Sequence, residues 1–254
     1  RRITEADVYE QARRLWMAHV EKDPGDPEVI WNAARFFFTN DKGLAAELLT
    51  RGMKLEPDDP RWKTQLGILQ MNVETVAPGE KGAGALGLLE TALAEAEGEA
   101  GRYHALAQVA EAALQAGEDA KARAYAEELL GLAERLPRDW HYGDAVHDGN
   151  RILGHVALRA ADVESAKAFL LKAGATPGSP VLGSFGPSLT LAADLLAKGE
   201  RDAVIQYLRM CARFWNGREE AIERLIGEIR SGGTPELNRF DVHRSGPART
   251  GSNR

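Results

Sequence analysis

Six alanine or valine residues recur along the chain at intervals close to the length of one helical hairpin. The successive intervals are 33, 40, 37, 44 and 38 residues, and the clearest repeat spans residues 152–174. Two antiparallel helices approach closely only where a small side chain sits at their crossing, so this spacing predicts one crossing in each hairpin. We call these six the register residues: Ala12, Ala45, Ala85, Ala122, Ala166 and Val204.

The repetition predicts an all-α solenoid of stacked antiparallel helical hairpins, with about 12 helices. Each hairpin buries one face internally and needs its neighbour to cover the other. Ala, Leu, Glu and Arg dominate the sequence and β-branched residues are sparse, which favours helix over strand. The last helix is expected near 217–230, and the first at 4–22, with one face made by Ala12, Leu15, Trp16 and His19.

Clusters of proline and glycine mark the connections. The sequence DPGDP at 23–27 ends the first helix, and Pro/Gly-rich loops are expected at 77–84 and 173–188. We assign one helical-repeat domain to residues 1–233. The last stretch, 234–254, is rich in Arg, Ser, Gly and Asn and is predicted to be a disordered basic tail.

The net charge and the cysteine content indicate which kinds of partner and which cellular compartment to expect. The formal net charge is −6, and the body of the chain has no basic stripe, so no nucleic-acid partner is expected. No apolar run is long enough to span a bilayer, so no membrane partner is expected. The single cysteine, Cys211, falls at an inward-facing helical position, where it acts as a small apolar residue. One cysteine fits a reducing compartment, which predicts a cytoplasmic location.

The start of the chain keeps a second location open. The sequence begins at Arg1 rather than Met, and its first helix aligns with the second helix of a repeat. A leader or a further repeat could therefore precede it, and a periplasmic location is kept as the alternative.

The hairpins resemble those of the tetratricopeptide repeat family. The residues that carry the resemblance are a Leu-Gly pair on the first helix and a small residue on the second. Leu153-Gly154, Ala166, Leu170 and Ala173 match this pattern in the fifth hairpin, and Leu66-Gly67 in the third. The second hairpin matches through Trp31, Ala45 and Pro57, and the pattern extends over about residues 4–215. Residues 139–215 also resemble an uncharacterised family of bacterial repeat proteins, through DWHYGDAVHDGN, TPGSP, SFGP and CARFW.

The tetratricopeptide resemblance implies a concave groove, lined by the first helix of each hairpin, that holds a peptide or helix of a partner protein. Arg151, His155 and Arg159 share one helical face and could grip a carboxylate. The alternative is a solvated polar face with local salt bridges. Together with Phe185 of the loop at 176–187, the candidate partner-binding residues are Asn32, Phe36, His104, Arg151, His155 and Arg159.

A second candidate site is a polar cluster at residues 140–150. His and Asp side chains can bind metal or exchange protons, and Asp144 and His147 are three residues apart, so they could share a helical face. The alternatives are a polar recognition patch and a helix start, in which Asp144 serves the first turn. The candidate residues are Trp140, His141, Asp144, His147 and Asn150.

The loop at 173–188 has two interpretations. Three prolines favour a stiff path, and Phe185 is expected to act as an apolar plug that holds the loop on the body of the protein. The loop is then a structural insertion, with a surface recognition loop as the alternative.

These patterns favour a non-enzymatic protein-interaction scaffold that needs no cofactor and no metal. The alternative is a metal-binding or catalytic protein built on His141, Asp144 and His147. The oligomeric state stays open. Self-association through residues 36–38 or through the open N-terminal end is a third hypothesis, and it would appear as a dimer in light scattering.

Overall fold

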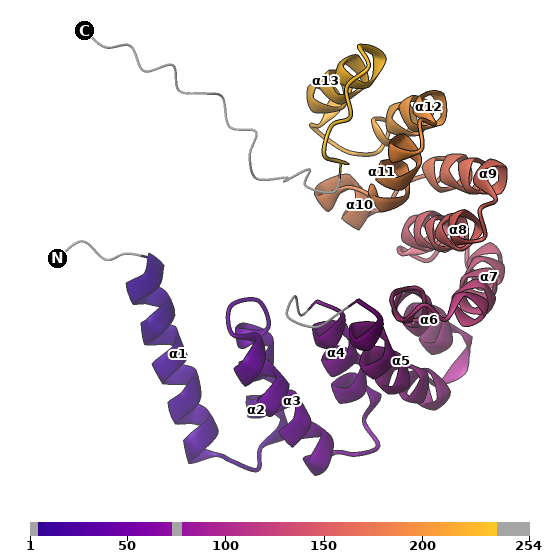
Figure 1. Ribbon diagram of the computed structural model, residues 1–254. Helices are drawn as coiled ribbons and strands as arrows, with labels where there is room; N and C mark the ends of the chain where they lie inside the picture. Colours follow the sequence, from indigo (N-terminus) through magenta and orange to yellow (C-terminus); the bar gives the residue numbers. More distant parts are fainter. Residues whose placement is uncertain (1–4, 73–77, 238–254) are drawn as a thin grey trace, which may run out of the picture. The chain divides into compact units, whose positions relative to one another are not determined.

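The computed structural model describes residues 5–72 and 78–237 and confirms an all-α fold of sequentially packed helices. Within these ranges there are 13 helices, and the chain divides into two compact units at Tyr125 and Ala126, inside α7. The first unit holds α1 to α6 and the start of α7 (Figure 1). Its helices are α1 (Glu5–Lys22), α2 (Pro27–Phe37), α3 (Lys42–Leu55), α4 (Pro60–Met71), α5 (Pro78–Glu95), α6 (Gly98–Ala116) and α7 (Asp119–Arg135).

Aspartate caps set the helix starts of the first unit where the sequence predicts them. Asp26 accepts hydrogen bonds from the backbone N–H groups of Glu28 and Val29, at 2.9 and 3.2 Å. Asp59 caps α4 in the same way, and a proline follows each of these two caps at the first helical position, where no N–H is needed. The connection at 23–27 is therefore confirmed.

The core of the first unit lies between successive helices. Each helix from α1 to α5 packs against the helix that follows it in the chain. Trp62, Phe37 and Ile30 are fully buried there, and the Trp62 indole donates a hydrogen bond to Glu56 at 3.1 Å. These aromatic side chains share one hydrophobic core cluster with the small register residue Ala45.

The prediction of a loop at 77–84 is wrong for most of that range. Helix α5 begins at Pro78 and continues through Gly79, Gly82 and Gly84. Proline is compatible with the first turn of a helix, so it starts this one rather than breaking it.

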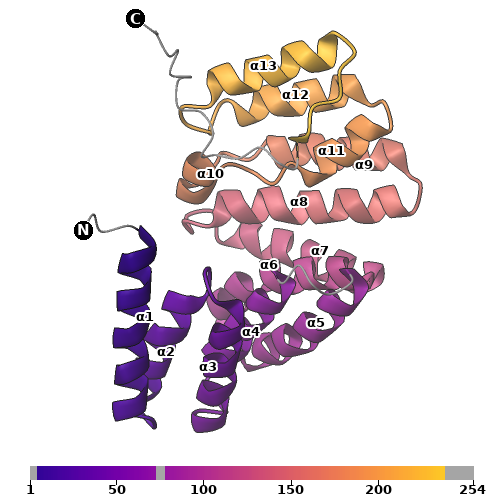
Figure 2. The same ribbon diagram turned by 60° about the vertical axis from the view of Figure 1, so that its left-hand side comes forward.

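The second unit contains stacked hairpins with one short insertion. Helices α8 and α9 form one hairpin, α11 and α12 the next, and α13 packs on α12; α9 contacts both α11 and α12 (Figure 2). The helices are α8 (Tyr142–Arg159), α9 (Val163–Gly174), α10 (Pro180–Phe185), α11 (Thr190–Ala197), α12 (Arg201–Cys211) and α13 (Glu219–Arg230).

Helix α10 is the element that the sequence does not predict. It occupies the middle of the loop expected at 173–188, where Ser179 caps it by accepting a hydrogen bond from the N–H of Leu182 at 2.9 Å. Thr176 donates a hydrogen bond to the carbonyl of Gly143 at 2.7 Å, which attaches the loop to the head of α8. Of the tail assigned to 234–254, residues 238–254 lie outside the described residues. Leu237 is buried in the core of the second unit.

Candidate functional site

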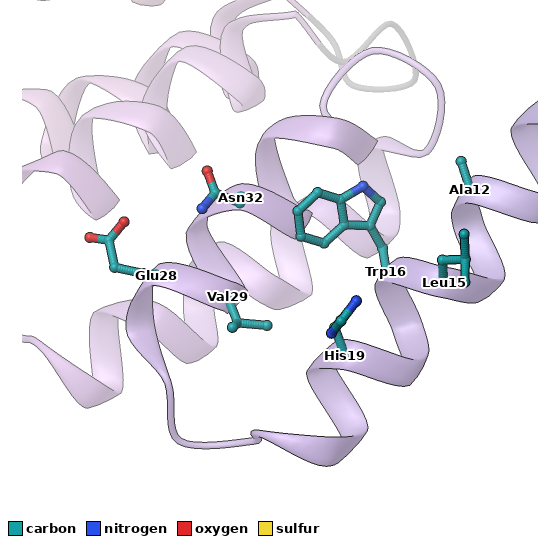
Figure 3. Close-up of a pocket in the computed structure, with 7 residues that line it drawn as sticks. All are labelled: Ala12, Leu15, Trp16, His19, Glu28, Val29 and Asn32. Carbon is teal, nitrogen blue, oxygen red and sulfur yellow. The ribbon is translucent and has the colours of Figure 1, made fainter.

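A groove suited to a partner lies between α1 and α2, with a volume of about 510 Å³. We call it the α1/α2 groove. Figure 3 shows its residues along the two helices that flank it. From α1 come Ala12, Leu15, Trp16 and His19, and from α2 come Glu28, Val29 and Asn32.

Aromatic rings hold α1 against α2 beside this groove. Phe36 stacks on Tyr9 with ring centroids 5.8 Å apart, and it also contacts Trp16 at 6.2 Å. Val20, one turn further along α1, is buried. Phe36, predicted as a partner-binding residue, is therefore half-buried within the hairpin, whereas Asn32 is exposed and lines the groove.

A second face of α1 remains open to solvent. Val8 is 55 % exposed and Leu15 is 58 % exposed, and Ala12 between them is only partly buried. The other register residues are all 0 % exposed: Ala45, Ala85, Ala122, Ala166 and Val204. Ala12 is thus a crossing residue of the same pattern whose crossing partner does not cover it.

Polar side chains at the edge of the groove already interact with neighbouring residues of the protein. Glu28 forms an ion pair with Arg61 at 3.6 Å, and the guanidinium of Arg61 lies 5.3 Å from the centre of the Trp31 ring. The imidazole of His19 contacts the edge of Trp16. The open part of the groove is therefore mainly apolar, with Asn32 as a hydrogen-bonding group.

Arg151, in the second unit, does not lie on an exposed wall as expected. It is only 8 % exposed, and its guanidinium Nε lies 3.6 Å from Asp148. Burial raises the pKa of Asp148, but the hydrogen bond from His147 and the charge of Arg151 outweigh it, so this pKa lies below its usual value. Arg151 therefore forms a local ion pair with Asp148 at a buried position, rather than on a solvated polar face.

His155 and Arg159 extend from the same side of α8 toward α11. The Nε2 atom of His155 lies 3.1 Å from the Thr190 hydroxyl, and its Nδ1 lies 3.4 Å from Asp194. Burial raises the pKa of Asp194, while the charges of Arg159 and Lys198 oppose that rise. Arg159 itself is exposed. The three predicted residues thus share a helix face, and among them Arg159 alone is classed as exposed.

The polar cluster at 140–150 separates into surface and core residues. His141 and Asp144 are 3.4 Å apart, and Asp144 accepts a hydrogen bond from Ser179 at 2.7 Å. His147 is instead fully buried, with Nδ1 3.0 Å from Asp148 and Nε2 3.0 Å from the Tyr207 hydroxyl on α12. Asn150 donates to the carbonyl of Val146, as a helix-interior amide does.

No metal centre results from this arrangement within the described ranges. There, no group of three or more His, Cys, Asp or Glu side chains is placed to hold a metal ion. His147 joins a buried network with Tyr207, beside Cys211, and burial raises the pKa of the Tyr207 hydroxyl well above its usual value. Burial also raises the pKa of the Cys211 thiol to about 12, which confirms its role as a small apolar core residue.

Phe185 does not plug its loop onto the body, because its side chain is 71 % exposed. Trp140 and Val181, at the head of α8 and on α10, are exposed as well. Three large apolar side chains are therefore exposed to solvent near the loop expected at 176–187. His104 of α6 is also exposed, with its ring 5.4 Å from that of Tyr103.

Comparison with known proteins leaves this geometry as the main guide to function. No model of a known protein family matches the chain, and no curated protein matches it. Among the helices in the described ranges, none is both long enough and apolar enough to cross a bilayer.

Proposed function

We propose that this protein is a non-enzymatic, tetratricopeptide-like interaction module that holds a helical segment of another polypeptide chain in the α1/α2 groove. The observation that carries the proposal is the open crossing at Ala12, flanked by exposed Val8 and Leu15. The other five register residues are fully buried.

The chemistry of the groove favours a helix over a small polar ligand. Ala12, Leu15, Trp16 and Val29 offer apolar surface, and Asn32 is the exposed amide beside them. A helix laid in such a groove needs an apolar stripe of its own, with residues at spacings of three and four. Burying an exposed leucine of this kind contributes about 1–2 kcal/mol, because half of its surface is already covered.

Stacked hairpins also explain why a helix fits this place. In a repeat array each hairpin needs a neighbour to cover its second face, and α4 contacts both α5 and α6 in that way. A helix that contacts both α1 and α2 would repeat the same arrangement beside α1.

Site-specific photo-crosslinking tests this function. A photoreactive amino acid replaces Leu15, and the protein is irradiated in a lysate of the source organism. We expect an adduct of higher mass whose crosslinked peptide is amphipathic and helical. The matched control carries the same amino acid in place of Leu55, an exposed leucine on α3.

Two results would contradict the proposal. One is the absence of any intermolecular adduct at position 15, and the other is an adduct that forms equally at position 55. Circular dichroism of both proteins checks that the α-helical fold is intact.

A further inference from the structure

We propose that a small pocket in the second unit binds a single neutral phenol ring, either a free phenol or the side chain of a tyrosine. The pocket has a volume of about 160 Å³ and lies where the connection from α10 to α11 meets the segment after α12. We call it the α10/α11 pocket, and the inference does not rest on the α1/α2 groove. Apolar surface comes from Phe185, Pro187, Trp215 and Leu237, and hydroxyl groups come from Ser188 and Thr190.

The size of the pocket fits one aromatic ring. A cavity of about 150 Å³ holds one benzene molecule, so a pocket of about 160 Å³ holds one six-membered ring rather than a larger fused system. Trp215 and Phe185 both line the space, and aromatic rings pack favourably on one another. Trp215 is 2 % exposed, whereas Phe185 is 71 % exposed. A bound ring would therefore contact a buried wall at Trp215 and cover part of the exposed Phe185.

The walls of the pocket are fixed by close contacts. Gly186 has a φ of +85° and packs so closely on Trp215 that a β-carbon at position 186 would overlap the indole ring. The N–H of Asn216 donates a hydrogen bond to the carbonyl of Gly183 at 3.1 Å. Leu237 is buried. The connection from α10 to α11 is thus held on Trp215 before any ligand binds, and a preformed site loses less entropy on binding.

A chain of hydrogen bonds determines which kind of polar group the pocket accepts. The Nδ1 atom of His155 lies 3.4 Å from the Asp194 carboxylate, which favours the proton on Nδ1 and leaves Nε2 as an acceptor. The Thr190 hydroxyl, 3.1 Å from Nε2, therefore donates to His155. The Ser188 hydroxyl, 3.0 Å from the Thr190 oxygen, then donates to Thr190. Each hydroxyl has one proton, so the Ser188 oxygen offers a ligand only lone pairs, and the ligand must be a donor.

The pocket offers no counter-charge to an ion. None of the described residues that line it is charged, so an ammonium group or a carboxylate would lose its water shell there without a partner. A phenol carries the required O–H donor on a neutral ring of the required size. The volume, the polarity and the uncharged lining therefore all favour the same class of ligand.

Chemical-shift mapping with p-cresol, the side-chain analogue of tyrosine, tests this pocket. The ¹⁵N-labelled full chain has five tryptophans, and each gives one indole N–H signal. We expect p-cresol to shift the signal of Trp215 with a dissociation constant of about 0.1–10 mM, and to leave the signal of Trp62 in the first unit unchanged. Comparison with a Trp215→Phe variant assigns the Trp215 signal.

The matched probe is 4-fluorotoluene, in which fluorine replaces the hydroxyl at nearly the same size and cannot donate. It should bind at least about 10-fold more weakly than p-cresol. Ser188→Ala should remove this preference, whereas Ser184→Ala, at an exposed serine of α10, should keep it. Thr190→Val should also reduce the preference, because the Ser188 hydroxyl is then no longer held as a donor to Thr190.

The amide of N-acetyl-tyrosine distinguishes the two sources of the ring. If it shifts the Trp215 signal as p-cresol does, the ligand is a tyrosine side chain, and if p-cresol alone does so, the ligand is a free phenol. The proposal is overturned if neither compound shifts this signal at about 20 mM, or if wild-type protein binds p-cresol and 4-fluorotoluene equally. A preference for p-cresol that Ser188→Ala leaves intact also overturns it.

Discussion

Trp62 of α4 packs directly against Gly52 of α3, so closely that a β-carbon at position 52 would overlap the indole ring. Both residues are buried. We expect Gly52→Ala to lower the free energy of unfolding by about 1–3 kcal/mol, because the overlap outweighs the better helix propensity of alanine. Urea unfolding followed by circular dichroism measures the change.

Gly87→Ala is the matched control for that substitution. Gly87 lies within α5, and a β-carbon there would meet no atom within 4 Å. It should therefore stabilise the protein by about 0.5–1 kcal/mol. If the two alanine variants shift stability in the same direction, the close contact between α3 and α4 is wrong.

The buried pair His147 and Tyr207 is expected to stabilise the second unit. Their side chains are 3.0 Å apart, so Tyr207→Phe leaves the imidazole Nε2 without its hydroxyl partner. We expect a loss of about 1–3 kcal/mol in the free energy of unfolding. In a double-mutant cycle with His147→Ala, the two losses should be non-additive by at least about 0.5 kcal/mol, and simple additivity would argue against the contact.

Arg151 and Arg159 should respond differently to charge reversal, although they share a face of α8. Arg151 is only 8 % exposed, so Arg151→Glu buries an unpaired negative charge close to Asp148, and we expect a loss of about 3–5 kcal/mol in the free energy of unfolding. Arg159→Glu, at an exposed position, should change it by less than about 1 kcal/mol. Equal thermal unfolding midpoints for the two variants would contradict the burial of Arg151.

Alkaline pH should destabilise the second unit through Cys211. Its folded pKa is raised to about 12, above that of an unfolded thiol, about 8.5. The stabilising contribution of the protonated thiol is therefore complete below about pH 8.5 and is lost as the pH rises toward 12, by up to about 1.4 kcal/mol per pH unit. Cys211→Ala should reduce the slope of unfolding free energy against pH over this range. An unchanged slope would indicate a thiol that titrates normally.

The spacing of small residues was enough to predict the class of fold, and proline, glycine and aspartate marked the ends of several helices. Aspartate followed by proline marks the starts of α2 and α4, and Ala12 to His19 form one face of α1 as predicted. The short helix α10 escaped prediction, since it depends on Ser179 as a cap and on Asp144 as a hydrogen-bond partner 35 residues earlier. The helical start of α5 was not predicted, because proline and glycine also occur in loops.

The candidate site was harder to predict, because burial depends on neighbours that periodicity does not reveal. Arg151 and His147 have the spacing of surface residues, yet α12 and Asp148 enclose them. Leu15 shares the predicted face with Ala12, Trp16 and His19, yet it is 58 % exposed. The spacings of four, three and four from Val8 to His19 are visible in the sequence, whereas the exposure of Val8 and Leu15 is visible only in the structure.

The most direct test of the α1/α2 groove is a labelling rate. Ala12→Cys, with Cys211 buried and unreactive, is labelled with a maleimide in dilute buffer and again in a concentrated lysate of the source organism. Occupation of the groove by a helix predicts labelling at least about 10-fold slower in the lysate, whereas a Leu55→Cys control should be labelled at the same relative rate in both. If position 12 is labelled as fast as position 55 under all conditions, the groove is not a binding site for another chain.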